Sequence, residues 1–145
     1  MTDMKERSAR LRKLGLVPTI QRLAVLEYLD NTDQHPTAEE IYAAIQKRLP
    51  TISRATVYNT LDILTKSHAI RRLTIDPTAS RYDTLNDTHS HFYCRICHKV
   101  YDIESPRLRS VHNRIDGHRI ETVQVYAYGI CADCRKKQGE EEKDA

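Results

Sequence analysis

The sequence predicts an α+β protein of two small domains, a winged helix-turn-helix followed by a small α/β domain. Three observations predict it: apolar residues at helical spacing in the first half, a basic hairpin pattern directly after them, and two Cys-x-x-Cys pairs in the second half. A chain of 145 residues is long enough for one ordinary domain or two small ones. We expect the first domain over 1–84, a hinge over 85–88, the second domain over 89–134 and a disordered tail over 135–145.

Four helices are expected in the first domain. A short basic helix over 7–14 is expected to end near Gly15 and Pro18. Thr19, Thr37 and Ser53 are N-cap residues for the three later helices, because each can accept a hydrogen bond from the free N–H groups of a helix start. The second of these caps belongs to a capping box, Thr-Ala-Glu-Glu. The inner faces of the three later helices are formed by Ile20, Leu23, Leu26 and Leu29, by Ile41, Ala44 and Ile45, and by Val57, Leu61 and Leu64.

A β-hairpin is expected after the fourth helix. Its strands run over 69–75 and 81–84, and the turn-forming residues of 76–80 lie between them. The basic residues Arg71, Arg72 and Arg81 are expected near its tip. Three helices followed by a basic hairpin make a winged helix-turn-helix.

The pattern changes after the polar hinge. Short strands flank the first cysteine pair, and a helix is expected from Ser105-Pro106 to Gly117, with Leu108, Val111 and Ile115 inside. Apolar and polar residues alternate over 120–128, which predicts one longer strand. The second cysteine pair follows directly. The tail over 135–145 has no core residues, and we expect it to be disordered.

The four cysteines are Cys94, Cys97, Cys131 and Cys134. The chain has neither an apolar run of the roughly 18 residues that a membrane span needs nor a secretory signal, so we expect a cytoplasmic protein without membrane contact. Cytoplasmic thiols stay reduced, and two Cys-x-x-Cys pairs can bring four thiolates into the tetrahedron of a structural zinc site. The alternative, a thioredoxin-like redox pair, needs a βαβ context that the pattern lacks.

A second metal site is expected from residues that the zinc does not need. His89 and His91 alternate along a strand, so both imidazoles point to one face. Asp83 and Asp102 lie near them in the sequence. Nitrogen and carboxylate ligands together suit iron(II), manganese(II) or zinc. The alternative is a solvated strand face with two surface carboxylates.

The charge is unevenly distributed along the chain. Residues 1–82 hold 13 Lys and Arg against 9 Asp and Glu, and the whole chain has a net charge of +3. A basic first half is compatible with a nucleic-acid partner, although ordinary scatter of surface charge gives the same count. On the fourth helix, Arg and Asn side chains can read base edges, and Tyr can bond a phosphate or contact a thymine methyl group. The candidates for DNA contact are Arg54, Thr56, Tyr58, Asn59, Arg71 and Arg72.

Several motifs together resemble the ferric uptake regulator family of dimeric, metal-sensing bacterial repressors. They are GLVPTIQRLAVL, HPTAEEIY, RATVYNTLDIL, RYD, HSHFYCRICHKVYDIE and YGICADC, and the resemblance covers about residues 10–135. It implies a homodimer, with dimerisation in the second domain, bound to a double-stranded DNA operator of inverted-repeat symmetry. It also implies one more ligand, the histidine of the HPTA motif, which is His35. The regulatory site would then consist of His35, Asp83, His89, His91 and Asp102.

The carboxylates also indicate a branch of that family. Iron-responsive members usually have Glu where this chain has Asp83 and Asp102, whereas peroxide-sensing members have Asp at both positions. Ser90 and Val123 stand where some iron-responsive members have further ligands. The resemblance to peroxide sensors implies that bound iron(II) reacts with hydrogen peroxide, that His35 and His89 are oxidised, and that the repressor then releases DNA. Manganese(II) would occupy the same site without this chemistry.

Two other functions use the same residues. One is an iron- or zinc-responsive repressor of metal-uptake genes. The other is a metalloenzyme, because two His and two Asp could hold a catalytic metal. No general base or nucleophile accompanies these ligands, and an enzyme would leave the winged helix without a role. The sequence therefore favours a regulator rather than an enzyme.

Overall fold

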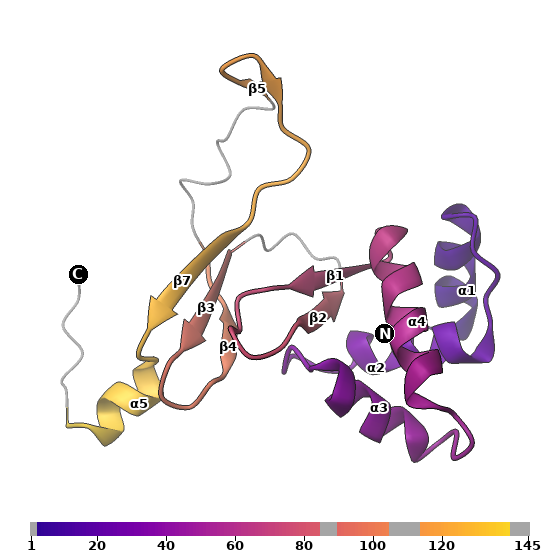
Figure 1. Cartoon of the computed structure of the whole chain (residues 1–145), viewed down its shortest axis with the longest axis horizontal. Helices are drawn as coiled ribbons and strands as arrows, with labels where there is room; N and C mark the ends of the chain where they lie inside the picture. The colour runs from indigo at the N-terminus through magenta and orange to yellow at the C-terminus, as the bar shows by residue number, and fades with distance from the viewer. Residues whose placement is uncertain (1–2, 85–89, 105–113, 140–145) are drawn as a thin grey trace. The chain divides into compact units, whose positions relative to one another are not determined.

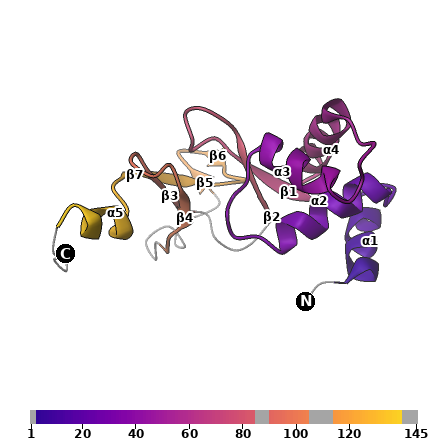
Figure 2. The same cartoon turned by 90° about the horizontal axis from the view of Figure 1, so that it is seen from below.

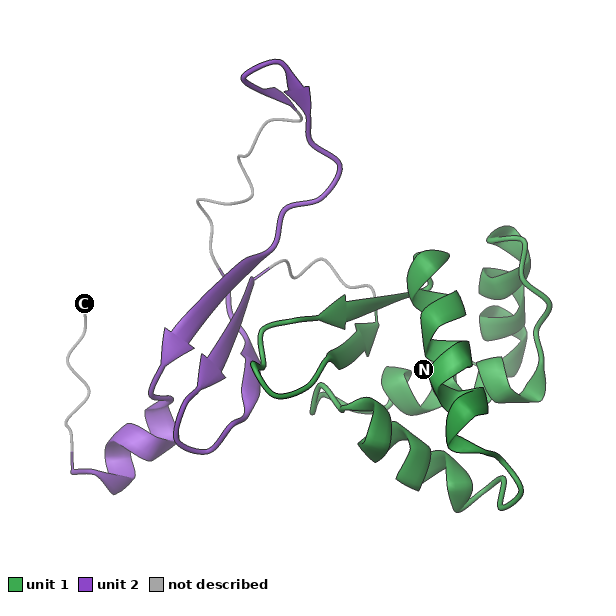
Figure 3. Ribbon diagram, in the orientation of Figure 1, with its two compact units in different colours: residues 1–85 green, residues 86–145 purple. Residues whose placement is uncertain are grey.

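The computed structural model describes residues 3–84, 90–104 and 114–139. The chain divides into two compact units, Met1–Leu85 and Asn86–Ala145 (Figure 3). Each unit has its own core and is described by itself. Within the described ranges, no helix combines the length and the apolar character that crossing a membrane requires.

Unit 1 begins with four helices (Figure 1). These are α1 (Met4–Lys13), α2 (Ile20–Asp30), α3 (Ala38–Gln46) and α4 (Arg54–Lys66). The expected caps of the last three are confirmed, because the side chains of Thr19, Thr37 and Ser53 each accept a hydrogen bond from the backbone N–H three residues on. Helix α1 starts earlier than expected, since Asp3 caps it in the same way.

The core of unit 1 lies among these helices. Ile41 and Ile45 of the predicted α3 face are buried while Ala44 is half-buried, and Val57, Leu61 and Leu64 of α4 are fully inaccessible. Helix α2 contributes Leu26 and Leu29. Ile20 is an exception, because it is the first residue of α2 and 68% exposed. Burying these faces against one another stabilises the unit by roughly 1.5–3 kcal/mol for each large apolar side chain.

A hairpin completes unit 1. Strand β1 (Ile70–Leu73) pairs antiparallel with β2 (Arg81–Thr84), in a register that sets Arg71 opposite Asp83 and Leu73 opposite Arg81. The predicted winged helix-turn-helix is confirmed. Arg71 is the one basic residue placed wrongly, since it lies toward the open end of the hairpin and is buried rather than near the tip.

Unit 2 is built on a three-stranded sheet in the order β4-β3-β7 (Figures 1 and 2). Strand β3 (Ser90–Cys94) pairs antiparallel with β4 (Val100–Asp102) and parallel with β7 (Val125–Gly129). The short helix α5 (Ala132–Lys137) follows β7 after a short connection. The longer strand expected over 120–128 is therefore found only in its second half.

Two sequence predictions for unit 2 are wrong. Residues 105–113 of the expected helix lie outside the described residues, but Arg114–Ile115 (β5) and His118–Arg119 (β6) form a small hairpin, and Ile115 is exposed. Asp116 and Gly117 connect the strands with φ of 49° and 82°, and such Asp-Gly pairs favour tight hairpin turns because both central residues need positive φ. The tail is also ordered further than expected, since α5 continues to Lys137.

Candidate functional site

The four cysteines come together in unit 2. Cys94 ends β3, Cys97 lies in the turn that follows, Cys131 caps α5 and Cys134 lies in its first turn. All four Sγ atoms lie within 4.8 Å of one another, and Cys97 Sγ is 3.8 Å from Cys131 Sγ. Zinc–sulfur bonds of about 2.3 Å in a tetrahedron separate the sulfurs by about 3.8 Å, whereas a disulfide needs about 2.05 Å. The geometry therefore fits a tetrahedral metal ion.

Backbone N–H groups favour the thiolate form of Cys94 and Cys131. The N–H of Cys131 donates to Cys94 Sγ and the N–H of Cys134 donates to Cys131 Sγ, both at 3.4 Å. Burial raises the pKa of Cys94, but backbone N–H groups, that of Cys131 first, lower this pKa to about 6. A hydrogen bond from Tyr101 lowers the pKa of Cys131. Burial and the neighbouring sulfurs raise the pKa of Cys134 to about 12. A bound cation would be needed to hold all four as thiolates at neutral pH.

Unit 1 holds one buried imidazole beside a buried carboxylate. His35 precedes α3, Asp83 lies on β2, and His35 Nε2 is 3.5 Å from Asp83 Oδ2. Both residues are less than a tenth exposed. Two ligand atoms about 2.1 Å from one metal ion lie about 3.0–3.4 Å apart at octahedral to tetrahedral angles. This pair is therefore spaced much like two neighbouring ligands of one ion.

The backbone of His35 is held in an unusual conformation. Its φ is 51°, in the left-handed region that costs a non-glycine residue about 1–3 kcal/mol. The Arg81 guanidinium donates to the His35 carbonyl at 3.1 Å, and the Tyr82 N–H donates to the Pro36 carbonyl at 2.9 Å. An isolated β-bridge joins Thr37 to Arg81. The segment that carries His35 is thus bound to the start of β2, two residues before Asp83.

Arg81 is itself fixed by Asp76 in the hairpin turn. Its Nε donates to Asp76 Oδ2 at 3.0 Å, and the side chains are 12% and 3% exposed. Asp76 Oδ1 accepts from the backbone N–H and the hydroxyl of Thr78. Burial raises the pKa of Asp76, but the Thr78 and Arg81 hydrogen bonds outweigh it, so the pKa lies below its ordinary value.

Unit 2 holds a second imidazole beside a carboxylate. His91 on β3 is fully buried and stands opposite Asp102 on β4 in the sheet register. His91 Nε2 is 3.2 Å from Asp102 Oδ1. Asp102 is 42% exposed at its side chain, so this pair reaches the surface of the unit. His89, the other predicted ligand on this strand, lies outside the described residues.

The candidates for DNA contact on α4 are exposed or half-buried. Arg54, Tyr58 and Asn59 are exposed, whereas Thr56 is half-buried and its Oγ1 is 2.9 Å from Ser53 Oγ. On the hairpin, Arg72 forms an ion pair with Asp62, and its guanidinium carbon lies 5.6 Å from the centre of the Tyr82 ring. The buried Arg71 does not share this surface.

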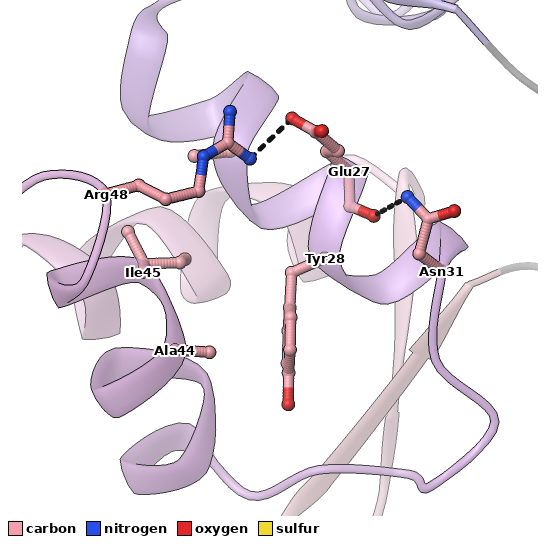
Figure 4. Close-up of a pocket in the computed structure, with 7 residues that line it drawn as sticks. Glu27, Tyr28, Asn31, Ala44, Ile45 and Arg48 are labelled. Carbon is pink, nitrogen blue, oxygen red and sulfur yellow. Dashed lines mark hydrogen bonds and ion pairs between the residues drawn. The ribbon is translucent and has the colours of Figure 1, made fainter.

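A hollow lies between α2 and α3, apart from the predicted metal ligands and DNA contacts of unit 1. Its volume is about 190 Å³, and the ion pair of Arg48 with Glu27 borders it while Tyr28 and Ile45 line it (Figure 4). It contains none of the predicted metal ligands or DNA contacts.

Sequence reasoning missed two residues with evident roles around these sites. Arg81 was expected only as a basic residue near the hairpin tip, and Glu39 only as part of a helix cap. Glu39 accepts hydrogen bonds from both Arg54 and Tyr58. Neither role has a local signal, because each bond joins residues far apart in the sequence.

Comparison with known proteins shows relatives of this chain both by sequence and by fold. The sequence matches the ferric uptake regulator family over residues 13–128. It is 36% identical over 139 residues to the peroxide operon regulator of Bacillus subtilis, covering 94% of this chain and 96% of that protein. Among solved structures, the peroxide stress regulator of Campylobacter jejuni is similar with a TM-score of 0.70 and 26% identity, covering 92% of this chain and 100% of that one. The Helicobacter pylori ferric uptake regulator Fur, described with three functional metal-binding sites, shares the fold with a TM-score of 0.77 at 23% identity, covering 99% and 97%.

Proposed function

Because the chain belongs to the ferric uptake regulator family, we propose that it is a metal-dependent, DNA-binding repressor that senses peroxide. The observation that carries this proposal is its 36% identity, over nearly the whole length of both proteins, to a peroxide operon regulator. The aspartates at positions 83 and 102 support the same branch. Members of the family are transcriptional regulators, so we propose no enzymatic activity and a site of action in the cytoplasm.

The first proposed metal is a structural zinc ion on Cys94, Cys97, Cys131 and Cys134. The sulfur separations and the N–H groups directed at two of the sulfurs support it. These four residues bring the end of β3 next to the start of α5. Cys94 and Cys131, at these two points, are 37 residues apart in the sequence. Zinc ligation would therefore hold together a unit whose sheet has three short strands.

The second proposed metal is a regulatory iron(II) or manganese(II) ion. We assign to it His35 and Asp83 of unit 1 and His89, His91 and Asp102 of unit 2. The spacing of the two imidazole–carboxylate pairs supports their use as ligands. A set of nitrogen and oxygen donors suits these metals better than thiolates would.

We assign DNA binding to the first unit and dimerisation to the second. Residues 1–84 would bind an inverted-repeat DNA operator through Arg54, Thr56, Tyr58, Asn59 and Arg72. Arg71 was also predicted to contact DNA, but we leave it out of the proposed contacts because it is buried. Residues 89–134 would form the dimer, so that two α4 helices reach half-sites about one helical turn apart or a multiple of it.

Peroxide sensing would act through the histidine ligands. Iron(II) held by these residues would supply the redox chemistry; in the net reaction hydrogen peroxide would transfer one oxygen atom to the ring of His35 or His89 and leave the other as water. An oxidised imidazole is a poor ligand, so the protein loses the regulatory metal. The proposed ligands belong to both units, and losing the metal therefore removes a link on which the DNA-binding arrangement depends.

The test is the intact mass of the zinc- and iron(II)-loaded protein before and after a low dose of hydrogen peroxide. We expect a gain of one oxygen atom, located by peptide mass spectrometry on His35 or His89, together with loss of DNA binding. The manganese(II)-loaded protein is the matched control and should keep both its mass and its DNA affinity. If the iron(II) form keeps its mass and stays on DNA, peroxide sensing is wrong and an iron-responsive repressor takes its place.

A further inference from the structure

Glu39 joins two of the candidate DNA contacts to the neighbouring helix. It lies in the first turn of α3, and its two carboxylate oxygens accept from Arg54 Nε at 3.2 Å each. The Tyr58 hydroxyl donates to the same carboxylate at 2.9 Å. Arg54 and Tyr58 are one helical turn apart on α4, so a single acidic side chain holds two exposed groups of that helix face.

Tyr42 completes this arrangement around Arg54. The guanidinium carbon of Arg54 lies 4.8 Å from the centre of the Tyr42 ring, within the range of a cation–π contact. Arg54 is thus held by a charge and by an aromatic face, both belonging to α3. The side chains of Arg54 and Glu39 remain 66% and 55% exposed, so solvent reaches the pair and it can open without disturbing the core.

We propose that Glu39 is a specificity-determining residue that competes with DNA for Arg54 and Tyr58. The inference rests on the proposed function, since it requires that α4 binds DNA. Arg54 Nε must leave the carboxylate before this N–H can donate to an acceptor of the DNA. DNA is then bound weakly if its acceptors bind Arg54 and Tyr58 no more strongly than the Glu39 carboxylate does.

The physical basis is the different acceptors that DNA presents. A guanine edge offers Arg54 two acceptors at fixed spacing, so one can take the Nε–H that Glu39 held while a terminal N–H donates to the other. A phosphate alone offers a charge like that of the carboxylate beside it, and the two repel each other. The competition therefore weakens binding through phosphates more than binding that includes a base contact. An exposed ion pair supports an effect of up to about fivefold in affinity.

The experiment compares Glu39→Gln with Glu40→Gln. Both changes remove one negative charge from the first turn of α3, but the Glu40 carboxylate acts on Tyr28 of α2, whose pKa is raised by burial and by that charge. Manganese(II)-loaded protein is titrated with two duplexes over a range of salt concentrations. One is the duplex that the parent protein enriches from a randomised inverted-repeat library, and the other is a scrambled duplex of equal length and composition.

We expect Glu39→Gln to bind the scrambled duplex about three- to fivefold more tightly, with a smaller gain on the enriched duplex. Its salt dependence on the scrambled duplex should steepen by about 0.9 in log K against log salt, because one more cation becomes available to a phosphate. Glu40→Gln should match the parent on both duplexes. In an Arg54→Ala background, Glu39→Gln should no longer steepen the salt dependence, because the cation that it releases is gone and only the uncharged Tyr58 hydroxyl remains to be freed.

Three outcomes overturn the inference. Equal effects of the two Gln variants would mean that only bulk charge matters. An unchanged Glu39→Gln would mean that the contact does not compete with DNA. A Glu39→Gln variant that loses affinity for the enriched duplex alone would mean that Glu39 supports a base contact instead. In each of these cases the parent protein still binds DNA, so the proposed function stands; a parent that enriches no duplex overturns both.

Discussion

The guanidinium of Arg81 donates a hydrogen bond to the backbone carbonyl of His35, across 46 positions of the sequence. The same guanidinium is held by Asp76, a buried carboxylate in the turn of the hairpin. A residue of the β1–β2 hairpin thus fixes the backbone of a proposed metal ligand. The conformation of His35 and that of the hairpin turn are therefore linked within unit 1.

Replacing Arg81 should weaken regulatory metal binding even though Arg81 is not a proposed ligand. We expect Arg81→Met to lower manganese(II) affinity about tenfold or more, because His35 loses the bond that supports its positive φ. Calorimetric titration of the zinc-loaded protein measures this. Arg48→Met, which removes a surface arginine bound to Glu27, is the control and should titrate like the parent. Parent-like affinity in a folded Arg81→Met would show that this bond does not position His35.

Asp76 should make stability depend on acid pH. Its pKa in the folded protein lies below the ordinary value of 3.8, so its contribution is present above that value and is lost as pH falls through the lower, folded-state pKa. Asp76→Asn should be less stable by about 1–3 kcal/mol at neutral pH, because hydrogen bonds to a buried charge are lost. Its stability should also fall less steeply in acid. Urea unfolding at several pH values tests this, and parallel curves for both proteins would contradict it.

The four-cysteine cluster should be required for unit 2 to fold. We expect Cys94→Ser to lose zinc and the dimer together, because thiolate ligation contributes directly to the folding of such a site. Metal analysis, size-exclusion chromatography and a thermal melt provide the measurements. One retained equivalent of zinc with a parent-like melting curve would show that these cysteines serve another purpose.

Arg54→Ala should weaken operator binding without changing metal content. A base contact by arginine contributes about 1–3 kcal/mol, which is a loss of roughly 5- to 150-fold in affinity. Fluorescence anisotropy with the enriched duplex and metal analysis of the same sample measure the two quantities. If the variant binds as tightly as the parent, α4 does not read the DNA through Arg54.

Asp102→Glu should separate metal binding from peroxide reactivity. One added methylene moves the carboxylate by roughly an ångström while the charge and ligand type stay the same, so iron(II) and DNA should still bind. We expect less oxygen to be added to the peptides that contain His35 and His89 at low peroxide. Tryptic mass spectrometry of parent and variant gives the comparison. Equal oxidation of the two would mean that the length of this side chain does not control the reaction.

The sequence by itself determined the four helices of unit 1, the caps of the last three and the hairpin. Helix starts and apolar faces depend on residues three or four positions apart, so Thr37 and Glu40 specify their bond locally. The two Cys-x-x-Cys pairs indicated a metal site, because each pair is a local structure with ligand spacing. The same local reasoning failed over 114–117, where helical spacing pointed to a helix and the Asp116-Gly117 turn formed a hairpin.

Only the tertiary structure decided which charged side chains meet. Arg71 and Arg81 look alike in the sequence, yet one is buried opposite Asp83 and the other binds Asp76 and the His35 carbonyl. Glu39 lies beside the capping-box residue Glu40 in the first turn of α3, and the packing of α3 beside α4 turns it toward Arg54. Long charged side chains have many rotamers of similar energy. Their partners are therefore chosen by the packing of segments distant in sequence, which local patterns do not contain.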